Sequence, residues 1–404
     1  MLGSRTLAAS LLALGVFLAG APAWAQFPGR TPGTTIFPEL PVRGPIVFYP
    51  TLTLGAEYND NVFLTNEHKR SDYIGSVTPG FQLILEGVTY RWSVGYSLTG
   101  EKYLHNDELD NAVQRQNFFL TGSHRLTPQF TLTLNEVFIE DKNTNFVGTE
   151  NIAVGRQKAL SNVFAPGFIW RFLPTTALRM EASYTLQRYD DPASADSNVY
   201  RLTADLNHDF TPRVVGILGY EARYLDVERQ LGVTTHTARL GMTYRFTPQT
   251  FATVVAGPTV RVTRGESPSV SPFVDALLSS IFSWGAASAY AQHSVGTAGG
   301  VGGTTENTSV GGLVQVTSLA RDLVLEAGPR YSLSKSTGGG DAVDVSSFSL
   351  DFRAMYRFTS WFSGIAGYRL FLQRSDSASS TIAGDIDQNR VFLGAQFGYP
   401  IKFE

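Results

Sequence analysis

Histidine is the side chain best suited to acid–base chemistry near neutral pH, and the six histidines of this chain are scattered along it. They are His68, His105, His124, His208, His236 and His293. None lies in a Gly-x-Ser-x-Gly, His-Glu-x-x-His or phosphate-loop context. The sequence therefore predicts no catalytic residue, and we expect that the protein is not an enzyme.

Ligands for a metal ion are equally sparse. The Asn-Asp-Asn run at 59–61 offers oxygen atoms, but it lacks the glycine and the distal glutamate of a calcium loop, so local capping of a loop is the simpler interpretation. In the run 205–209, alternation places His208 on the face opposite Asp205 and Asp209, which favours a solvated wall. The chain has no cysteine, which excludes a thiol nucleophile and a disulfide framework. We expect no metal and no cofactor.

Arginine is the more informative charged residue, because it recurs on the polar face of segments in which apolar and polar residues alternate. The candidates for a water-filled interior are Arg91, Arg179, Arg201, Arg223, Arg239, Arg261, Arg330, Arg353, Arg369 and Arg390, with the carboxylates Glu181, Asp205, Glu221, Glu326 and Asp351. An excess of fixed positive charge would favour anions, including acidic saccharides. The alternative is that each arginine pairs with a carboxylate on a neighbouring strand and stiffens the wall.

The elements that carry these charges are expected to be β-strands of about ten residues. In the segment 348–358, Phe348, Leu350, Phe352 and Tyr356 share one face, and Arg353 lies on the other. The same pattern gives apolar faces at Trp92, Val94, Tyr96, Leu98, Phe164, Phe168, Trp170, Phe172, Leu178, Met180, Ala182, Tyr184, Leu186, Val391, Leu393, Phe397, Tyr399 and Phe403. A soluble sandwich would also alternate, but strands this aromatic over several hundred residues favour an all-β, antiparallel, up-and-down transmembrane barrel. Tyr90, Phe172, Phe210, Phe246 and Phe358 stand beside short turns, as expected of rings at a membrane boundary.

The first residues indicate export. Arg5 precedes an apolar core at 7–18, and Ala23-Trp24-Ala25 forms a small-x-small site, so residues 1–25 are predicted to be a signal peptide that is cleaved near Ala25. Residues 26–45 are rich in proline and are expected to form a periplasmic arm, and residues 46–404 are expected to form the barrel. The predicted location is the outer membrane of a Gram-negative bacterium.

Short turns are predicted at 86–87, 127–128, 173–174, 211–212, 247–248, 320–321 and 359–360, where proline or a polar pair interrupts the pattern. Longer polar stretches, at 103–111, 141–157, 190–197, 336–341 and 376–387, are expected to be the outward-facing loops. The interval 264–307 is the exception, because it is long and alternates weakly. If 272–281 and 286–293 are strands around a turn at 282–285, the barrel has eighteen strands; otherwise it has sixteen and a long loop at 266–305. We favour eighteen, and both numbers are even, as bacterial barrels require.

An eighteen-stranded barrel encloses an aqueous channel unless a segment fills it. The candidates for filling it are the proline-rich stretch 27–45 and the 266–305 region. The first is too short for a globular plug, and whether the 266–305 region folds into the pore is left open. The final strand ends with its aromatic residue, Phe403, one position before the terminus, close to the terminal aromatic that barrel-insertion machinery reads.

The opening of the mature chain resembles a known family. The segment 58–65 (Tyr-Asn-Asp-Asn-Val-Phe-Leu-Thr), followed by 71–74 and 77–81, is similar to the start of outer-membrane β-barrel porins described as porin-2-like. Some of their members are associated with PEP-CTERM and exosortase exopolysaccharide systems. The segments 271–275 and 306–309 also resemble hairpins of that family. The resemblance covers most of the mature chain; it implies a channel and a link to surface polysaccharide, and it supplies no catalytic residue.

Three functions follow as hypotheses. The first is a channel for passive passage of small hydrophilic solutes, with a mild anion preference. The second is a conduit for export of an extracellular polysaccharide, and the third, least supported, is a barrel enzyme. The expected partners are outer-membrane lipid and lipopolysaccharide, the barrel-insertion machinery and, for the conduit, polysaccharide-export components. A formal net charge of −3 gives no reason to expect a nucleic-acid partner.

Overall fold

The computed structural model describes residues 46–403 except 114, 149, 337–342 and 376–383. The predicted signal peptide and proline-rich arm lie outside the described residues. Within them the chain is almost entirely β-strand, apart from two short 3₁₀ turns, η2 (Asp107–Leu109) and η3 (Thr144–Phe146). No described helix is long and apolar enough to cross a membrane.

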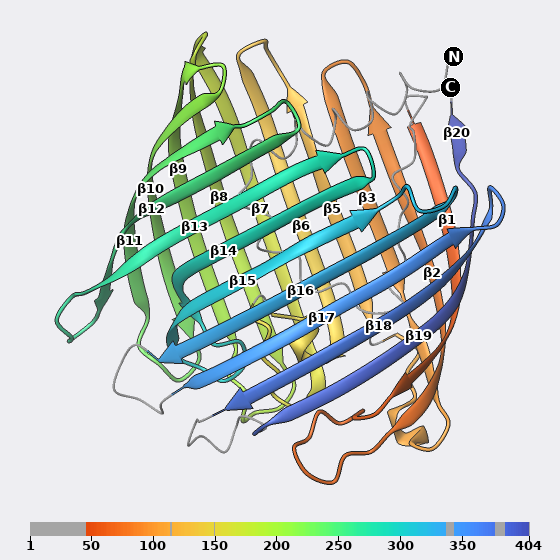
Figure 1. Cartoon of the computed structure of the whole chain (residues 1–404). Coiled ribbons are helices and arrows are strands. Elements are labelled where there is room, and N and C mark those ends of the chain that lie inside the picture. Colours follow the sequence, from red (N-terminus) through yellow and green to blue (C-terminus); the bar gives the residue numbers. More distant parts are fainter. Residues whose placement is uncertain (1–45, 114, 149, 337–342, 376–383, 404) are drawn as a thin grey trace.

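The strands run antiparallel, each paired with its neighbours in chain order (Figure 1). Their bounds are β1 (Ile46–Asn59), β2 (Asp72–Glu86), β3 (Tyr90–Leu98), β4 (Gly100–Tyr103), β5 (Gln116–Arg125), β6 (Phe130–Asn143), β7 (Arg156–Leu173), β8 (Thr176–Tyr189), β9 (Ser197–Thr211), β10 (Val214–Val227), β11 (Val233–Arg245), β12 (Thr250–Thr263), β13 (Ser269–Phe282), β14 (Gly285–Thr297), β15 (Thr304–Val316), β16 (Leu323–Ser336), β17 (Asp344–Arg357), β18 (Phe362–Ser375), β19 (Ile386–Gly398) and β20 (Ile401–Phe403).

The sheet closes on itself because the first strand pairs with the last. β1 pairs with β2 on one side and with β19 on the other, where Thr51 faces Gly398 and Asn59 faces Arg390. The start of β1 also pairs with β20. Because the barrel closes, the first and last strands have no free edge between them. In this way the backbone N–H and C=O groups of a β-structure can all form hydrogen bonds inside a membrane.

The barrel has eighteen strands, because β4 continues β3 along β2, and β20 continues β19 along β1. This confirms the larger of the two predicted numbers. The hairpin in the weakly alternating interval is β13 and β14, joined at residues 283–284. Its alternation is weak because β14 consists largely of alanine, serine and glycine. These small side chains differ little in polarity between the two faces of the strand.

The turns at 87–89, 126–129, 174–175, 212–213, 246–249, 283–284, 317–322 and 358–361 lie at the end of the barrel where β1 begins and β20 ends (Figure 1). Four of them share one device, a threonine whose hydroxyl oxygen accepts a backbone N–H three residues further on. These threonines are Thr127, Thr211, Thr247 and Thr359. The pairs predicted as turns are confirmed. In the four turns that contain these threonines, the bond from the side chain to the backbone stabilises the turn.

Candidate functional site: the barrel lumen

Alternation gives the wall two faces of opposite character. On neighbouring strands, Leu218 and Leu240 point outward and are 62% and 69% exposed, while Glu221 and Arg239 point inward and are each 3% exposed. The aromatic rings of Phe210, Phe246 and Phe358 are exposed on the outer face beside the short turns. Apolar residues outside and charges inside reverse the arrangement of a soluble domain, and they match a wall between lipid and water.

Glu181 on β8 is the centre of the first group of inner charges. Its carboxylate accepts a hydrogen bond from Arg201 on β9 (Nη2 to Oε1, 2.7 Å), and Arg179 lies 3.7 Å away. Arg201 also donates to Ser183 through Nε, at 3.1 Å. One carboxylate thus holds two arginines against the wall.

Asp205 on β9 pairs with Arg239 on β11, passing over the strand between them. Their closest atoms are 3.1 Å apart, and both side chains are buried. Gly219 on β10 makes this possible, because a Cβ there would lie 2.0 Å from Oδ1 of Asp205. Within β10, Nε of Arg223 donates a hydrogen bond to Oε1 of Glu221, at 2.5 Å.

The opposite part of the wall has a second series of pairs, each between neighbouring strands. Glu326 on β16 lies 3.8 Å from Arg353 on β17, and Asp351 on β17 lies 2.8 Å from Arg369 on β18. Glu57 on β1 accepts two hydrogen bonds from Arg390 on β19, at 2.7 and 3.0 Å. This last pair is buried and ties together the first and last strands.

All fifteen predicted lumen residues occupy inward positions of their strands by the alternation of burial. The structure brings most of them together as cross-strand ion pairs. Arg91, Arg261 and Arg330 lie outside these two series, and Arg330 donates to Ser332 at 3.2 Å. Fixed charge is therefore present along the lumen, and much of the positive charge faces a carboxylate.

The segments 144–148 and 150–155, here together named the lumen loop, do not extend away from the barrel as predicted. The lumen loop turns inward from β6 and β7 and reaches the far wall, where the Gln373 side chain on β18 donates to the carbonyl of Ala153 (3.0 Å) and accepts its N–H (2.8 Å). Asn151 donates to Ser347 on β17, at 3.1 Å. The loop therefore crosses the interior in the half of the barrel that carries the long loops.

Aromatic and apolar side chains fix the lumen loop in place. The Phe146 ring lies against two guanidinium groups, with its centroid 3.9 Å from Cζ of Arg369 and 5.0 Å from Cζ of Arg390. Ile152 and Val154 are buried with residues from other loops and strands. Burying these side chains stabilises the inward position, because they would otherwise face water.

The prediction that only 27–45 and the 266–305 region could enter the lumen was wrong. Most of the 266–305 region forms wall strands, as the eighteen-strand prediction requires, and its residues 295–303 turn inward, where Ala298 packs against the lumen loop. The main entering segment is one predicted to face outward. The sequence did contain an indication that this segment is buried, namely the apolar residues at 146–147 and 152–154. The polar residues around them favoured the prediction of an outward-facing loop.

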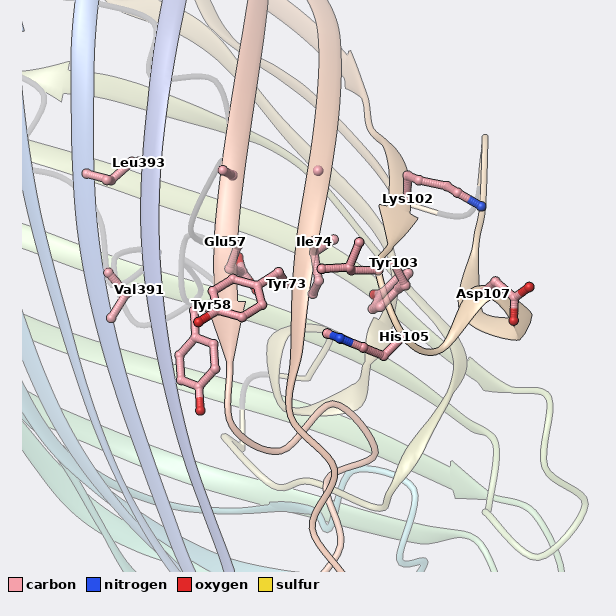
Figure 2. Close-up of a pocket in the computed structure, with 13 residues that line it drawn as sticks. Glu57, Tyr58, Tyr73, Ile74, Lys102, Tyr103, His105, Asp107, Val391 and Leu393 are labelled. Atoms are coloured by element: carbon pink, nitrogen blue, oxygen red, sulfur yellow. The ribbon is translucent and has the colours of Figure 1, made fainter.

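A hollow of about 780 Å³ lies on the outside of the wall. Figure 2 shows Tyr58 and Tyr73 side by side on β1 and β2, Val391 and Leu393 on β19, and Lys102 on β4. Ala56 and Gly75 are small residues at outward positions, which leaves the hollow between the larger side chains. It faces the lipid side and is not a solute site.

The histidines are distributed among separate wall contacts. His105 lies beside Asp72 at 3.1 Å, His208 beside Thr176 at 2.9 Å and His236 beside the Tyr220 hydroxyl at 2.6 Å. His293 lies 3.9 Å from Glu306, whose carboxylate also accepts a hydrogen bond from the Ser271 hydroxyl. In these described contacts the carboxylate lies between serine and histidine, whereas a hydrolytic triad requires the histidine between serine and carboxylate.

The apolar outer face, the charged inner face and the closed ladder together decide the architecture. The fold is that of a transmembrane β-barrel. An even number of strands with both ends on one side is the form of single-chain barrels in bacterial outer membranes, which is the location predicted from the sequence.

Comparison with known proteins gives likeness of structure only. No family model and no curated protein sequence matches the chain. Similar solved structures include OccAB4 of Acinetobacter baumannii (11% identity, TM-score 0.44, covering 88% of this chain and 98% of that one). Two others are from Pseudomonas aeruginosa. OccK2 (OpdF), in complex with glucuronate, has 10% identity and TM-score 0.45 over 87% and 98% of the chains, and the outer membrane protein opdK has 13% and 0.44 over 87% and 99%. At such identities, functional residues cannot be carried over by position.

Proposed function

We propose that the protein is a porin-like channel through which small hydrophilic solutes cross the outer membrane passively. The observation that carries the proposal is the inner wall, on which charged and hydroxyl side chains of successive strands face the interior. A ring of eighteen strands is wide enough to hold water inside unless it is filled. Such a wall suits a hydrated solute and not a lipid. Transport, and not catalysis, is the function proposed.

The lumen loop limits the size of the solute. It crosses the interior from β6 and β7 to β17 and β18, so the passage narrows in this half of the barrel. A long polymer would need this loop to move aside. For that reason passage of small solutes is better supported than export of a polysaccharide, which no contact in the described residues favours.

A weak anion preference is part of the proposal. Arginines outnumber carboxylates on the inner wall, and fixed positive charge lowers the barrier to anions. The preference should be weak because the ion pairs described above neutralise much of that charge within a few ångströms. Arg353 is the residue with which this contribution is tested, because its guanidinium lies 3.8 Å from Glu326, the longest of the ion pairs described above.

Export and insertion complete the proposal. Residues 1–25 would direct the chain across the inner membrane, and cleavage near Ala25 would leave the proline-rich arm in the periplasm. The barrel-insertion machinery would recognise the final strand, and outer-membrane lipid and lipopolysaccharide would surround the apolar face.

The test is single-channel conductance and reversal potential of the refolded protein in a planar bilayer under a potassium chloride gradient. A stable conductance with a reversal potential on the chloride side is expected. Arg353→Gln should shift that potential towards potassium, whereas the control Arg321→Gln, in an exposed turn with 97% of its side chain in water, should not. Absence of conductance in repeated insertions would refute the channel, and equal shifts from both variants would refute the role of the wall arginine.

A further inference from the structure

One seam of the barrel is incomplete. Backbone pairing between β13 and β14 ends at Val274 and His293. Beyond that point β13 continues to Ser269 in pairing with β12, and β14 continues to Thr297 in pairing with β15. The facing edges at 269–273 and 294–297 therefore belong to the wall on one side only.

A proline lies in the part of the seam that is open. Pro272 lies within the unpaired part of β13 and has no N–H to donate. If the register of the seam were continued, Pro272 would face Val295, and Val270 would face Thr297. Val270 is 70% exposed on the outer surface, as expected beside an open edge. Strands tolerate proline mainly where a backbone partner is missing.

The outer end of the β14–β15 hairpin lies inside the barrel mouth. We call residues 294–306 the hairpin tip. Val295 is buried against Leu225 on β10 and Val233 on β11, and its carbonyl accepts a hydrogen bond from Arg223 at 3.0 Å. These partners lie on the inner face, several strands away. The tip therefore bends inward, past the strand with which it would otherwise pair.

The hairpin tip also joins the obstruction made by the lumen loop. Thr297 donates to Glu150 of that loop, at 3.1 Å, and Ala298 is buried with Ile152 and Val154. The carbonyl of Gly300 accepts the N–H of Ala195, at 2.8 Å. Glycines at 299, 300, 302 and 303 have positive φ values, so the turn of the tip depends on residues with the widest backbone freedom.

We propose that the hairpin tip is a flap with two positions. In the closed position it lies inside the mouth, as in the structure. In the open position it swings outward, pairs with residues 269–273 of β13 and completes the seam, which withdraws the tip from the passage and removes one support of the lumen loop. The inference rests on the proposed channel, since the flap regulates that passage. Each position offers its own set of contacts: buried apolar packing inside, and new backbone hydrogen bonds in the wall.

The absence of cysteine from the sequence allows each position to be trapped by one engineered pair. Val295→Cys with Leu225→Cys traps the closed position, and Val295→Cys with Val233→Cys replaces it if that variant does not fold. Val270→Cys with Thr297→Cys traps the open position and leaves Pro272 in place. Directly opposed residues of antiparallel strands have Cα atoms about 4.5–5.5 Å apart, within the range for a disulfide. In the closed position Val270 is on the outer surface and Thr297 is buried inside, so this pair reports the swing.

Cross-linking is read by mass spectrometry before any conductance is measured. The control is Ala276→Cys with Ala291→Cys, a rung of the same seam that is already paired. We expect all three pairs to oxidise. The closed trap should lower conductance at least twofold and the open trap should raise it at least twofold, both reversed by dithiothreitol, while the control pair leaves it unchanged.

The outcomes separate the two proposals. If the open pair stays reduced while the control pair oxidises, the tip does not leave the mouth and the flap is refuted. If the open pair oxidises but conductance does not change, the tip moves without gating. If both traps form in a protein that never conducts, the motion stands and the proposed channel fails.

Discussion

Removing the side chain of Gln373 tests whether the lumen loop restricts the passage. This amide holds the backbone of Ala153 by two hydrogen bonds of 2.8 and 3.0 Å, and Ala153 is fully buried. Gln373→Ala deletes both bonds and leaves the N–H and carbonyl of Ala153 without these partners. The sequence of the loop itself is unchanged, so the variant weakens the attachment of the loop to β18.

The size of the effect follows from the number of bonds. A hydrogen bond contributes about 1 kcal/mol net, so loss of two destabilises the attached position by about 2 kcal/mol. Each 1.4 kcal/mol is a factor of ten in an equilibrium, which makes the expected increase in the detached population about 30-fold. The other contacts of the loop, including Asn151 with Ser347 and the Phe146 ring, remain and keep the attached position favoured.

The measurement is the distribution of conductance levels in single-channel recordings. We expect a high-conductance level, rare in the parent protein, to be occupied about 30 times more often in Gln373→Ala. The matched control is Gln388→Ala, because Gln388 on β19 also makes two buried hydrogen bonds but none to the lumen loop: its Nε2 donates to Oδ1 of Asn59 on β1 and to the carbonyl of Asn61. If the two variants have the same level distribution, or if neither differs from the parent, the lumen loop does not restrict the passage.

Two further changes test the wall itself. Glu57→Ala leaves the buried guanidinium of Arg390 without its carboxylate at the seam between β1 and β19, so urea unfolding should show a loss of about 3–5 kcal/mol. The control is Asp322→Ala, because Asp322 lies in a turn and its partner Arg357 is exposed. This control should lose at most about 1 kcal/mol, and comparable losses from both variants would contradict the role of burial. Leu240→Arg places a charge in the middle of the outer face of β11 and should cost about 2–4 kcal/mol in lipid. Leu319→Arg, equally exposed but in a short turn, should be nearly neutral, and a similar cost at both positions would argue that Leu240 does not face lipid.

The architecture could be predicted from the sequence because strand alternation is a local property. Whether Leu218 or Glu221 faces lipid depends on the parity of its position along one strand, and the strong contrast between apolar and charged residues fixed that parity on nearly every strand. Threonine-containing turns are equally local, since Thr127 and Thr247 bond to a backbone only three residues away. The even strand number followed once every turn had been recognised.

Ion pairing could be anticipated but not assigned. The sequence placed arginines and carboxylates on one face, and register then decided which side chains meet. Asp205 reaches Arg239 two strands away only because Gly219 leaves room between them. No pattern along a single strand contains that information.

The sequence by itself therefore determined the two faces of the wall and the turns between strands. It also predicts the export route of the protein. What only the tertiary structure decided is the content of the lumen: the inward course of the lumen loop and the bent end of β14 and β15. Both depend on contacts between residues far apart in the chain, such as Ala153 with Gln373 and Val295 with Leu225. A loop can satisfy its polar backbone in water or against a distant wall, and the choice depends on apolar partners that become neighbours only when the barrel closes.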